Sequence, residues 1–152
     1  MAEIISAIFA GIAILVSIYA AITANKSAAA AIRSTNCSEI FDDYLMKKIP
    51  QARAILDFDG GGYLRDGNNL CNVLTSMNVS SLFYKYDDSV FFEELTKQCG
   101  KLEDMIVEAG NHPLPSENDQ RKFWEEVQSS LESIYKLIDK KRIGQSEMNP
   151  KS

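Results

Sequence analysis

The residues with the clearest capacity for chemistry form one short string, Asp57-Phe58-Asp59-Gly60-Gly61-Gly62. Its two carboxylates stand one residue apart, and carboxylate oxygens are the ligands that Ca²⁺ and Mg²⁺ prefer. A carboxylate beside a metal ion can also act as the nucleophile or the acid/base of phosphoryl transfer. We therefore predict Asp57 and Asp59 as candidate metal ligands.

The string resembles the opening motif of haloacid-dehalogenase-type phosphatases, in which hydrophobic residues precede Asp-x-Asp-Gly. The resemblance covers residues 57–64. It implies that Asp57 is the phosphorylated nucleophile and Asp59 the acid/base, with Asp87, Asp88 and Lys85 available to hold Mg²⁺ and neutralise charge. That family places its aspartates at the end of a parallel strand, whereas this chain lacks an alternating β-α pattern. A metal-dependent hydrolase or phosphatase is the alternative function.

The string is also similar to a calcium loop of the EF-hand kind, with Asp57 at position 1, Asp59 at position 3 and Gly62 at position 6. Position 12 is Asn68, where such loops use a glutamate that supplies two oxygens. A weak calcium-responsive adaptor is therefore a further alternative. A third interpretation is a solvated, glycine-rich connection between two helices.

Other ingredients of catalysis are scarce in the sequence. His112 is the only histidine, and Cys37, Cys71 and Cys99 lie too far apart for a zinc knuckle. No Gly-Lys-Ser/Thr string is present to bind phosphate. We predict no cofactor and favour a protein without catalytic activity.

The N-terminal segment from Ile4 to Asn25 contains no charged residue. A helix of that length crosses the roughly 30 Å hydrocarbon core of a bilayer, which predicts a transmembrane anchor over residues 1–25. Lys26 and Arg33 follow the span, so the positive-inside rule places the N-terminus outside and the rest in the cytoplasm. A signal peptide cleaved near Ala24 and a buried core helix are the alternatives.

Small residues recur through this segment with a period of about 3.5 residues. Small side chains allow two helices to approach closely, which favours association of helices in lipid. The stripe predicts a packing face for self-association, made of Ser6, Ala10, Ala13, Ser17, Ala20 and Ala24.

Composition limits the partners of the chain. It has 152 residues, with 16 Lys and Arg against 21 Asp and Glu, and its net charge is -5. Binding to nucleic acid needs a basic face, so we predict no nucleic-acid partner. The predicted partners are the lipid bilayer and either a second copy of this chain or another membrane protein.

Beyond residue 25, apolar residues recur at helical spacing in segments separated by glycine and proline. Asp88 or Ser89 is a predicted N-cap, and Ser116 with Asp119 resembles a capping box. The predicted fold class is all-α: a single transmembrane helix, then a small cytoplasmic helical bundle over residues 26–144 with about four or five helices. Residues 145–152 are a predicted disordered tail. The predicted function is a single-pass, membrane-anchored helical interaction or accessory protein.

Overall fold

The computed structural model describes residues 2–143, except for the side chains at positions 2–15, 29–34 and 36. The predicted tail over 145–152 lies outside the described residues. The elements, in chain order, are α1 (Ala2–Asp43), a π-helical turn η1 (Tyr44–Lys48), α2 (Ile49–Ala54), β1 (Asp57–Phe58), β2 (Leu64–Arg65), α3 (Gly67–Ser80), α4 (Tyr84–Asp87), α5 (Ser89–Asn111) and α6 (Glu117–Arg142).

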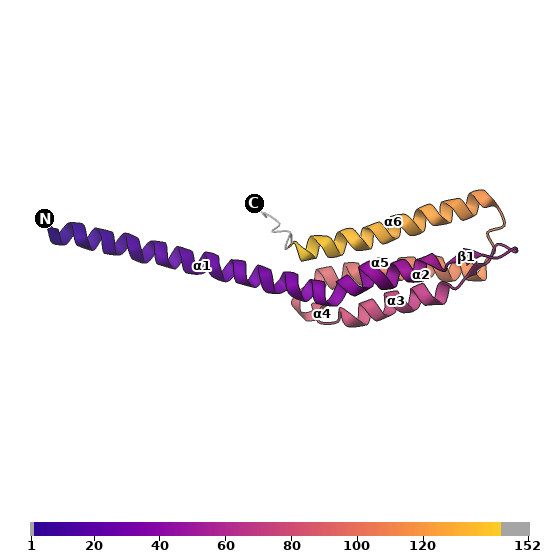
Figure 1. Cartoon of the computed structure of the whole chain (residues 1–152), viewed down its shortest axis with the longest axis horizontal. Coiled ribbons are helices and arrows are strands. Elements are labelled where there is room, and N and C mark those ends of the chain that lie inside the picture. Colours follow the sequence, from indigo (N-terminus) through magenta and orange to yellow (C-terminus); the bar gives the residue numbers. More distant parts are fainter. Residues whose placement is uncertain (1, 144–152) are drawn as a thin grey trace.

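The helices form an antiparallel bundle from which the N-terminal part of α1 projects (Figure 1). α1 and α2 run in one direction, α3 returns beside them, α5 runs forward again and α6 returns to the end where α1 enters. The β1–β2 hairpin and the α5–α6 connection lie together at the opposite end. The predicted all-α helical bundle is thereby confirmed.

The predicted fold class is wrong in its transmembrane anchor. Among the residues whose side chains the structure describes, no helix is long and apolar enough to cross a membrane. From Val16 onward α1 mixes isoleucine and tyrosine with serine, threonine, asparagine and lysine, which lowers its apolar content. α1 continues without interruption from Ala2 to Asp43. The predicted cytoplasmic location depended on the anchor, and it stays an untested prediction.

The helix ends follow the local signals in the sequence. Asp88 caps α5, because its Oδ1 accepts a hydrogen bond from the Phe91 backbone N–H at 3.1 Å. Ser116 caps α6 in the same way, since its Oγ accepts from the Asn118 N–H at 3.2 Å. The predicted N-caps at Asp88 and Ser116 are thus both observed.

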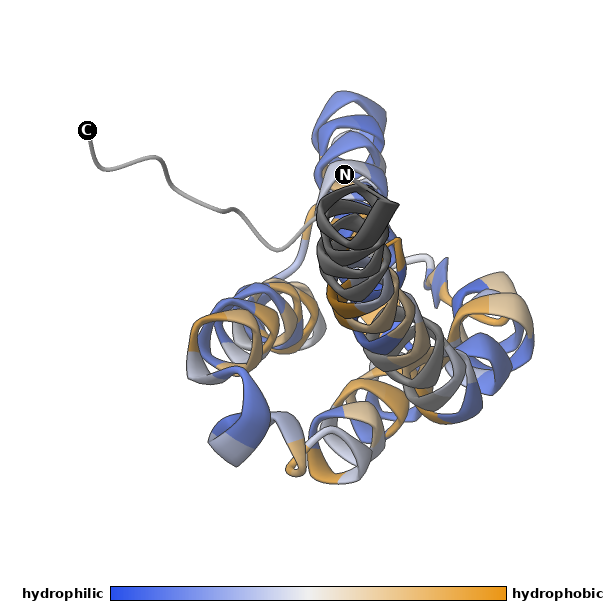
Figure 2. Ribbon diagram, turned by 90° about the vertical axis from the view of Figure 1, so that its left-hand side faces the viewer, coloured by the Kyte–Doolittle hydropathy of each residue, from blue (hydrophilic) through white to orange (hydrophobic). Residues whose placement is uncertain are grey.

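Each helix of the bundle carries a hydrophilic and a hydrophobic side (Figure 2). At the end where α1 enters, the rings of Phe41, Tyr84 and Phe91 pack together with centroids 5.0–6.0 Å apart. Lys141 lies over two of these rings and donates to Asp88 Oδ2 at 2.7 Å. Its side chain is only 10% exposed, so this ion pair is shielded from water and ties the end of α6 to α5.

The Asp57–Arg65 segment forms a two-stranded antiparallel hairpin, in which Asp57 pairs with Arg65 and Phe58 with Leu64. The sequence predicted a loop here, because strands of two residues are too short to show an alternating pattern. Phe58 packs edge-on against Phe123 and Trp124, so the hairpin covers the start of α6. The Leu114 N–H donates to the Gly62 carbonyl at 2.7 Å, which fixes the hairpin to the α5–α6 connection.

We predict that Gly62→Ala lowers the free energy of unfolding by about 2 kcal/mol, because Gly62 has a φ of 82° and a Cβ there lies 2.7 Å from the Leu114 backbone. Urea unfolding of the full chain measures the change. Gly60→Ala is the matched control in the same hairpin, since no atom lies within 4 Å of a Cβ at that position. Equal losses in the two variants would contradict the steric explanation.

Candidate functional site

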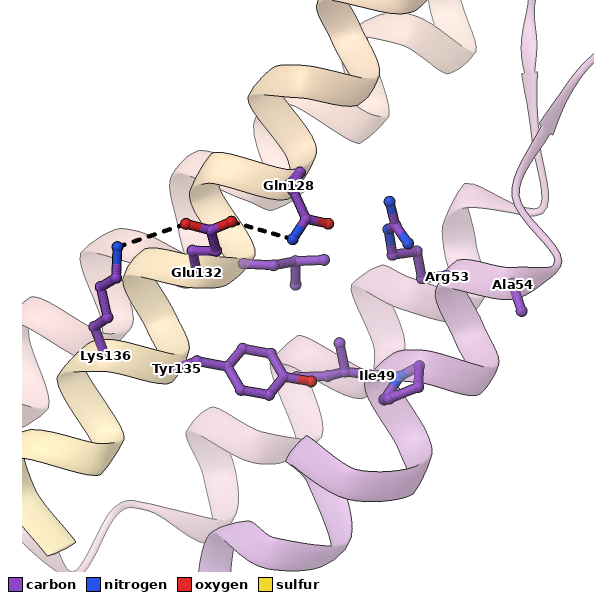
Figure 3. A pocket seen from close by; sticks show the side chains of 9 residues that line it. Ile49, Arg53, Ala54, Gln128, Glu132, Tyr135 and Lys136 are labelled. Atoms are coloured by element: carbon purple, nitrogen blue, oxygen red, sulfur yellow. Dashed lines mark hydrogen bonds and ion pairs between the residues drawn. The ribbon is translucent and has the colours of Figure 1, made fainter.

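A cavity of about 500 Å³ lies between α2 and α6 (Figure 3). We call it the α2–α6 groove. Its floor is apolar, since Ile49 is 1% exposed and Leu131 is 4% exposed. The full set of lining residues is Ile49, Pro50, Arg53, Ala54, Gln128, Leu131, Glu132, Tyr135 and Lys136.

The groove lies beside the π-helical turn, and Pro50 explains why the turn occurs there. Proline has no backbone N–H, and its ring clashes with the carbonyl four residues earlier in an α-helix. The Ile49 N–H accordingly bonds to the Tyr44 carbonyl, five residues back, in place of the Leu45 carbonyl. The backbone hydrogen-bond spacing thus increases from four residues to five where η1 passes into α2.

This change of register leaves the Leu45 carbonyl without a donor from its own helix. Its α-helical donor, the Ile49 N–H, is bound to Tyr44, and its π-helical donor would be Pro50, which has none. The Tyr135 hydroxyl on α6 donates to this carbonyl at 2.6 Å. Burial raises the pKa of Tyr135 and the Arg53 guanidinium opposes the shift, so the hydroxyl keeps the proton that it donates.

The charges on the two walls of the groove differ in their pairing. On α6, Glu132 accepts a hydrogen bond from Gln128 at 3.3 Å and pairs with Lys136 at 3.5 Å (Figure 3). On α2, the exposed Arg53 side chain points into the groove. It forms no hydrogen bond or ion pair with any residue that the structure describes. The α2 wall therefore presents a positive charge that none of the described side chains matches with an opposite charge.

A second cavity of about 310 Å³ continues along α6 toward the end where α1 enters. Tyr135 and Lys136 line both cavities, so the Tyr135–Leu45 hydrogen bond crosses the seam where they meet. The second cavity ends at Arg142, which pairs with Asp42 at 3.6 Å and Asp139 at 3.3 Å. The seam follows α6 from Gln128 to Arg142, a length of about 21 Å.

The predicted metal ligands Asp57 and Asp59 lie on the hairpin, away from the groove. Asp59 Oδ1 accepts from the Gly61 and Tyr63 N–H groups at 2.9 Å each, and Asp59 Oδ2 pairs with the Arg65 guanidinium at 2.7 Å. These contacts lower the pKa of Asp59, the Tyr63 N–H contributing most. A metal ion would have to displace Arg65. The described side chains include no group of three or more His, Cys, Asp or Glu that could hold a metal ion.

The structure gives no test of metal binding by Asp57 and Asp59, which stays a prediction. It does show how these residues are used within the fold. Asp57 accepts a hydrogen bond from the N–H of Phe58 at 2.9 Å, and Asp59 organises the turn. The sheet is a two-stranded antiparallel hairpin, whereas the phosphatase motif requires the end of a parallel strand. This geometry gives no support to phosphoryl transfer.

The remaining candidate nucleophiles and bases are separated from one another. Cys37 and Cys99 are buried and Cys71 is half-buried. Burial raises the pKa of all three thiols, that of Cys99 to about 12, so little reactive thiolate forms near neutral pH. His112 is exposed and lines a cavity of about 280 Å³ at the other end of the bundle.

The structure describes only some of the side chains of the predicted packing stripe. The side chains of Ser6, Ala10 and Ala13 lie outside the described residues. Ser17, Ala20 and Ala24 are exposed on the projecting part of α1, on the same side of the helix by their spacing. The stripe is therefore available to a partner along its described length.

The chain matches no protein-family model, no curated protein and no solved structure at a significant level. The assignment of a site therefore rests on the geometry alone.

Sequence analysis did not find the α2–α6 groove. Leu131 falls on the apolar side of the last helix, and neither Tyr135 nor Arg53 lies in a sequence motif that marks a site. One local signal was present: Pro50 within a helical pattern indicates that a nearby carbonyl loses its donor. Which side chain replaces that donor depends on the fold.

We expect Tyr135→Phe to lower the free energy of unfolding by about 1 kcal/mol, because it leaves the partly buried Leu45 carbonyl without a donor. Tyr86→Phe is the control, since Tyr86 is 89% exposed. In a Pro50→Ala background residue 50 regains an N–H, and the loss caused by Tyr135→Phe should shrink. Urea unfolding of the four variants measures this coupling, and an unchanged loss would rule out our explanation of the bond.

Asp59 should make stability depend on acid pH. Its pKa is lowered in the folded chain, so its contribution is present above the unfolded pKa of about 4 and is lost as the pH falls through the folded pKa. Wild type should therefore exceed Asp59→Asn in stability at pH 6, and the difference should shrink below about pH 4. The comparison uses urea unfolding midpoints across pH, and a constant difference would contradict it.

Proposed function

We propose that this protein is a helical interaction protein that self-associates through the projecting part of α1. The observation that carries the proposal is the exposure of large apolar side chains on that helix: Val16 is 60%, Ile18 52%, Tyr19 74% and Ile22 49% exposed. No residue that the structure describes covers them. Exposed apolar area of this kind marks an interaction surface.

The two sides of the projecting helix differ in shape. Ile18 and Ile22 lie one turn apart on one side, whereas Ser17, Ala20 and Ala24 lie on another. The small side allows two helix backbones to approach closely, so that dispersion contacts along the helices favour association. We therefore assign the closest approach of the two copies to the small side, where the exposed Val16 lies one turn before Ala20 and extends the apolar contact.

A second exposed apolar area supports an interaction protein as well. It surrounds the short α4 at the end of the bundle where α1 enters, and it contains Val79, Leu82, Phe83, Tyr86 and Val90. Together with the scattered positions of the candidate nucleophiles, this surface favours binding over catalysis. The hydrolase and calcium-adaptor alternatives gain no support from the geometry of the hairpin.

Ala20→Leu should weaken self-association by about tenfold, because the larger side chain holds the two helices apart. Asn25→Leu is the matched control, since it places the same uncharged side chain at an exposed position about 100° around the helix from Ala24, away from the small side. Sedimentation equilibrium of the full chain in aqueous buffer without detergent measures the dissociation constant. Equal effects of the two substitutions, or a monomeric wild type, would refute the proposal.

A further inference from the structure

The α2–α6 groove has features of a binding site that the contact between α1 helices does not use. Its walls are two helices that do not close on each other, and its floor is the buried apolar pair Ile49 and Leu131. It runs along α6 from Gln128 to Lys136, about 12 Å, and beyond the Tyr135–Leu45 hydrogen bond the second cavity continues the same line to Arg142. A helix of about four turns can lie along this line, which is longer than a compact small ligand requires.

The charged residues along the seam indicate which charge the occupant carries. Glu132 is compensated by Lys136, and Arg142 is compensated by Asp42 and Asp139. Arg53 remains as a cation without an ion pair among the described residues, at the end of the groove farther from Arg142. A carboxylate on the occupant would complete this pairing, and the guanidinium fork suits carboxylate geometry.

We infer that the α2–α6 groove binds an amphipathic helix of a partner protein, with the apolar stripe of that helix on Ile49 and Leu131 and a carboxylate at Arg53. The projecting α1 of a second copy fits this site poorly. Over residues 16–28, where the structure describes its exposed side chains, Lys26 is the only charge, and Arg53 repels it. The groove and the α1 surface therefore serve different partners.

A charge-swap experiment tests the inference with defined probes. Two fluorescent 15-residue helical peptides carry leucines at positions 2, 6, 9 and 13, as a helix-in-groove ligand does. They differ only at position 3, which is glutamate in one peptide and lysine in the other. Fluorescence anisotropy measures their binding to the purified full chain. We expect the glutamate peptide to bind wild type about fivefold more tightly than the lysine peptide.

Two variants and a control complete the design. Arg53→Glu should reverse the preference between the peptides, whereas Lys97→Glu, which changes an exposed cation on α5, should preserve it. Ala54→Trp fills the groove from an exposed position and should abolish binding of both peptides. Circular dichroism of each variant confirms that the bundle is folded.

The inference is overturned if neither peptide binds, if Arg53→Glu leaves the preference unchanged, or if Ala54→Trp leaves binding unchanged. It is also overturned if Ala54→Trp dissociates a dimer of the chain, because the occupant is then a second copy. None of these results depends on the effect of Ala20→Leu, so the inference and the proposed function fail separately.

Discussion

The hydrogen bond from the Tyr135 hydroxyl to the Leu45 carbonyl is the interaction on which the shape of the α2–α6 groove depends. Pro50 prevents the first helical segment from continuing in the α register, and the π turn that results leaves one carbonyl without a donor. A partly buried carbonyl without a donor costs free energy, and the Tyr135 hydroxyl of α6 lies close enough to supply the donor. The same hydrogen bond sets the position at which η1 contacts α6. Beyond this position α2 and α6 separate and form the groove.

The separation of α2 from α6 is stable because the bundle is closed at both ends by other contacts. At the end where α1 enters, Lys141 binds Asp88 over the rings of Tyr84 and Phe91. At the opposite end, Phe58 of the hairpin packs on Trp124 of α6. The α2–α6 groove therefore lies between two ends of the bundle at which the helices are packed together. Its apolar floor is accessible while the rest of the hydrophobic core stays buried.

This arrangement suits binding better than catalysis. Binding needs an accessible apolar surface with a few placed charges, and the groove and the projecting helix provide both. Catalysis needs several reactive groups within hydrogen-bond reach of one another. Here Asp59 is engaged by the hairpin itself, and the three thiols are held protonated by burial. The carboxylates that suggested chemistry in the sequence contribute to a turn.

The sequence by itself determined the helical character of the bundle and the starts of α5 and α6, because helix periodicity and N-caps are local: Asp88 and Ser116 act on groups two or three residues away. It did not determine the hairpin, whose strands are too short to show an alternating pattern. The prediction of a transmembrane anchor from the N-terminal segment was wrong.

Only the tertiary structure decided the groove. Tyr135 and Leu45 are 90 residues apart, and Lys141 and Asp88 are 53 apart. Periodicity shows which side of a helix is buried, but the partner that buries it is set by how the helices pack together.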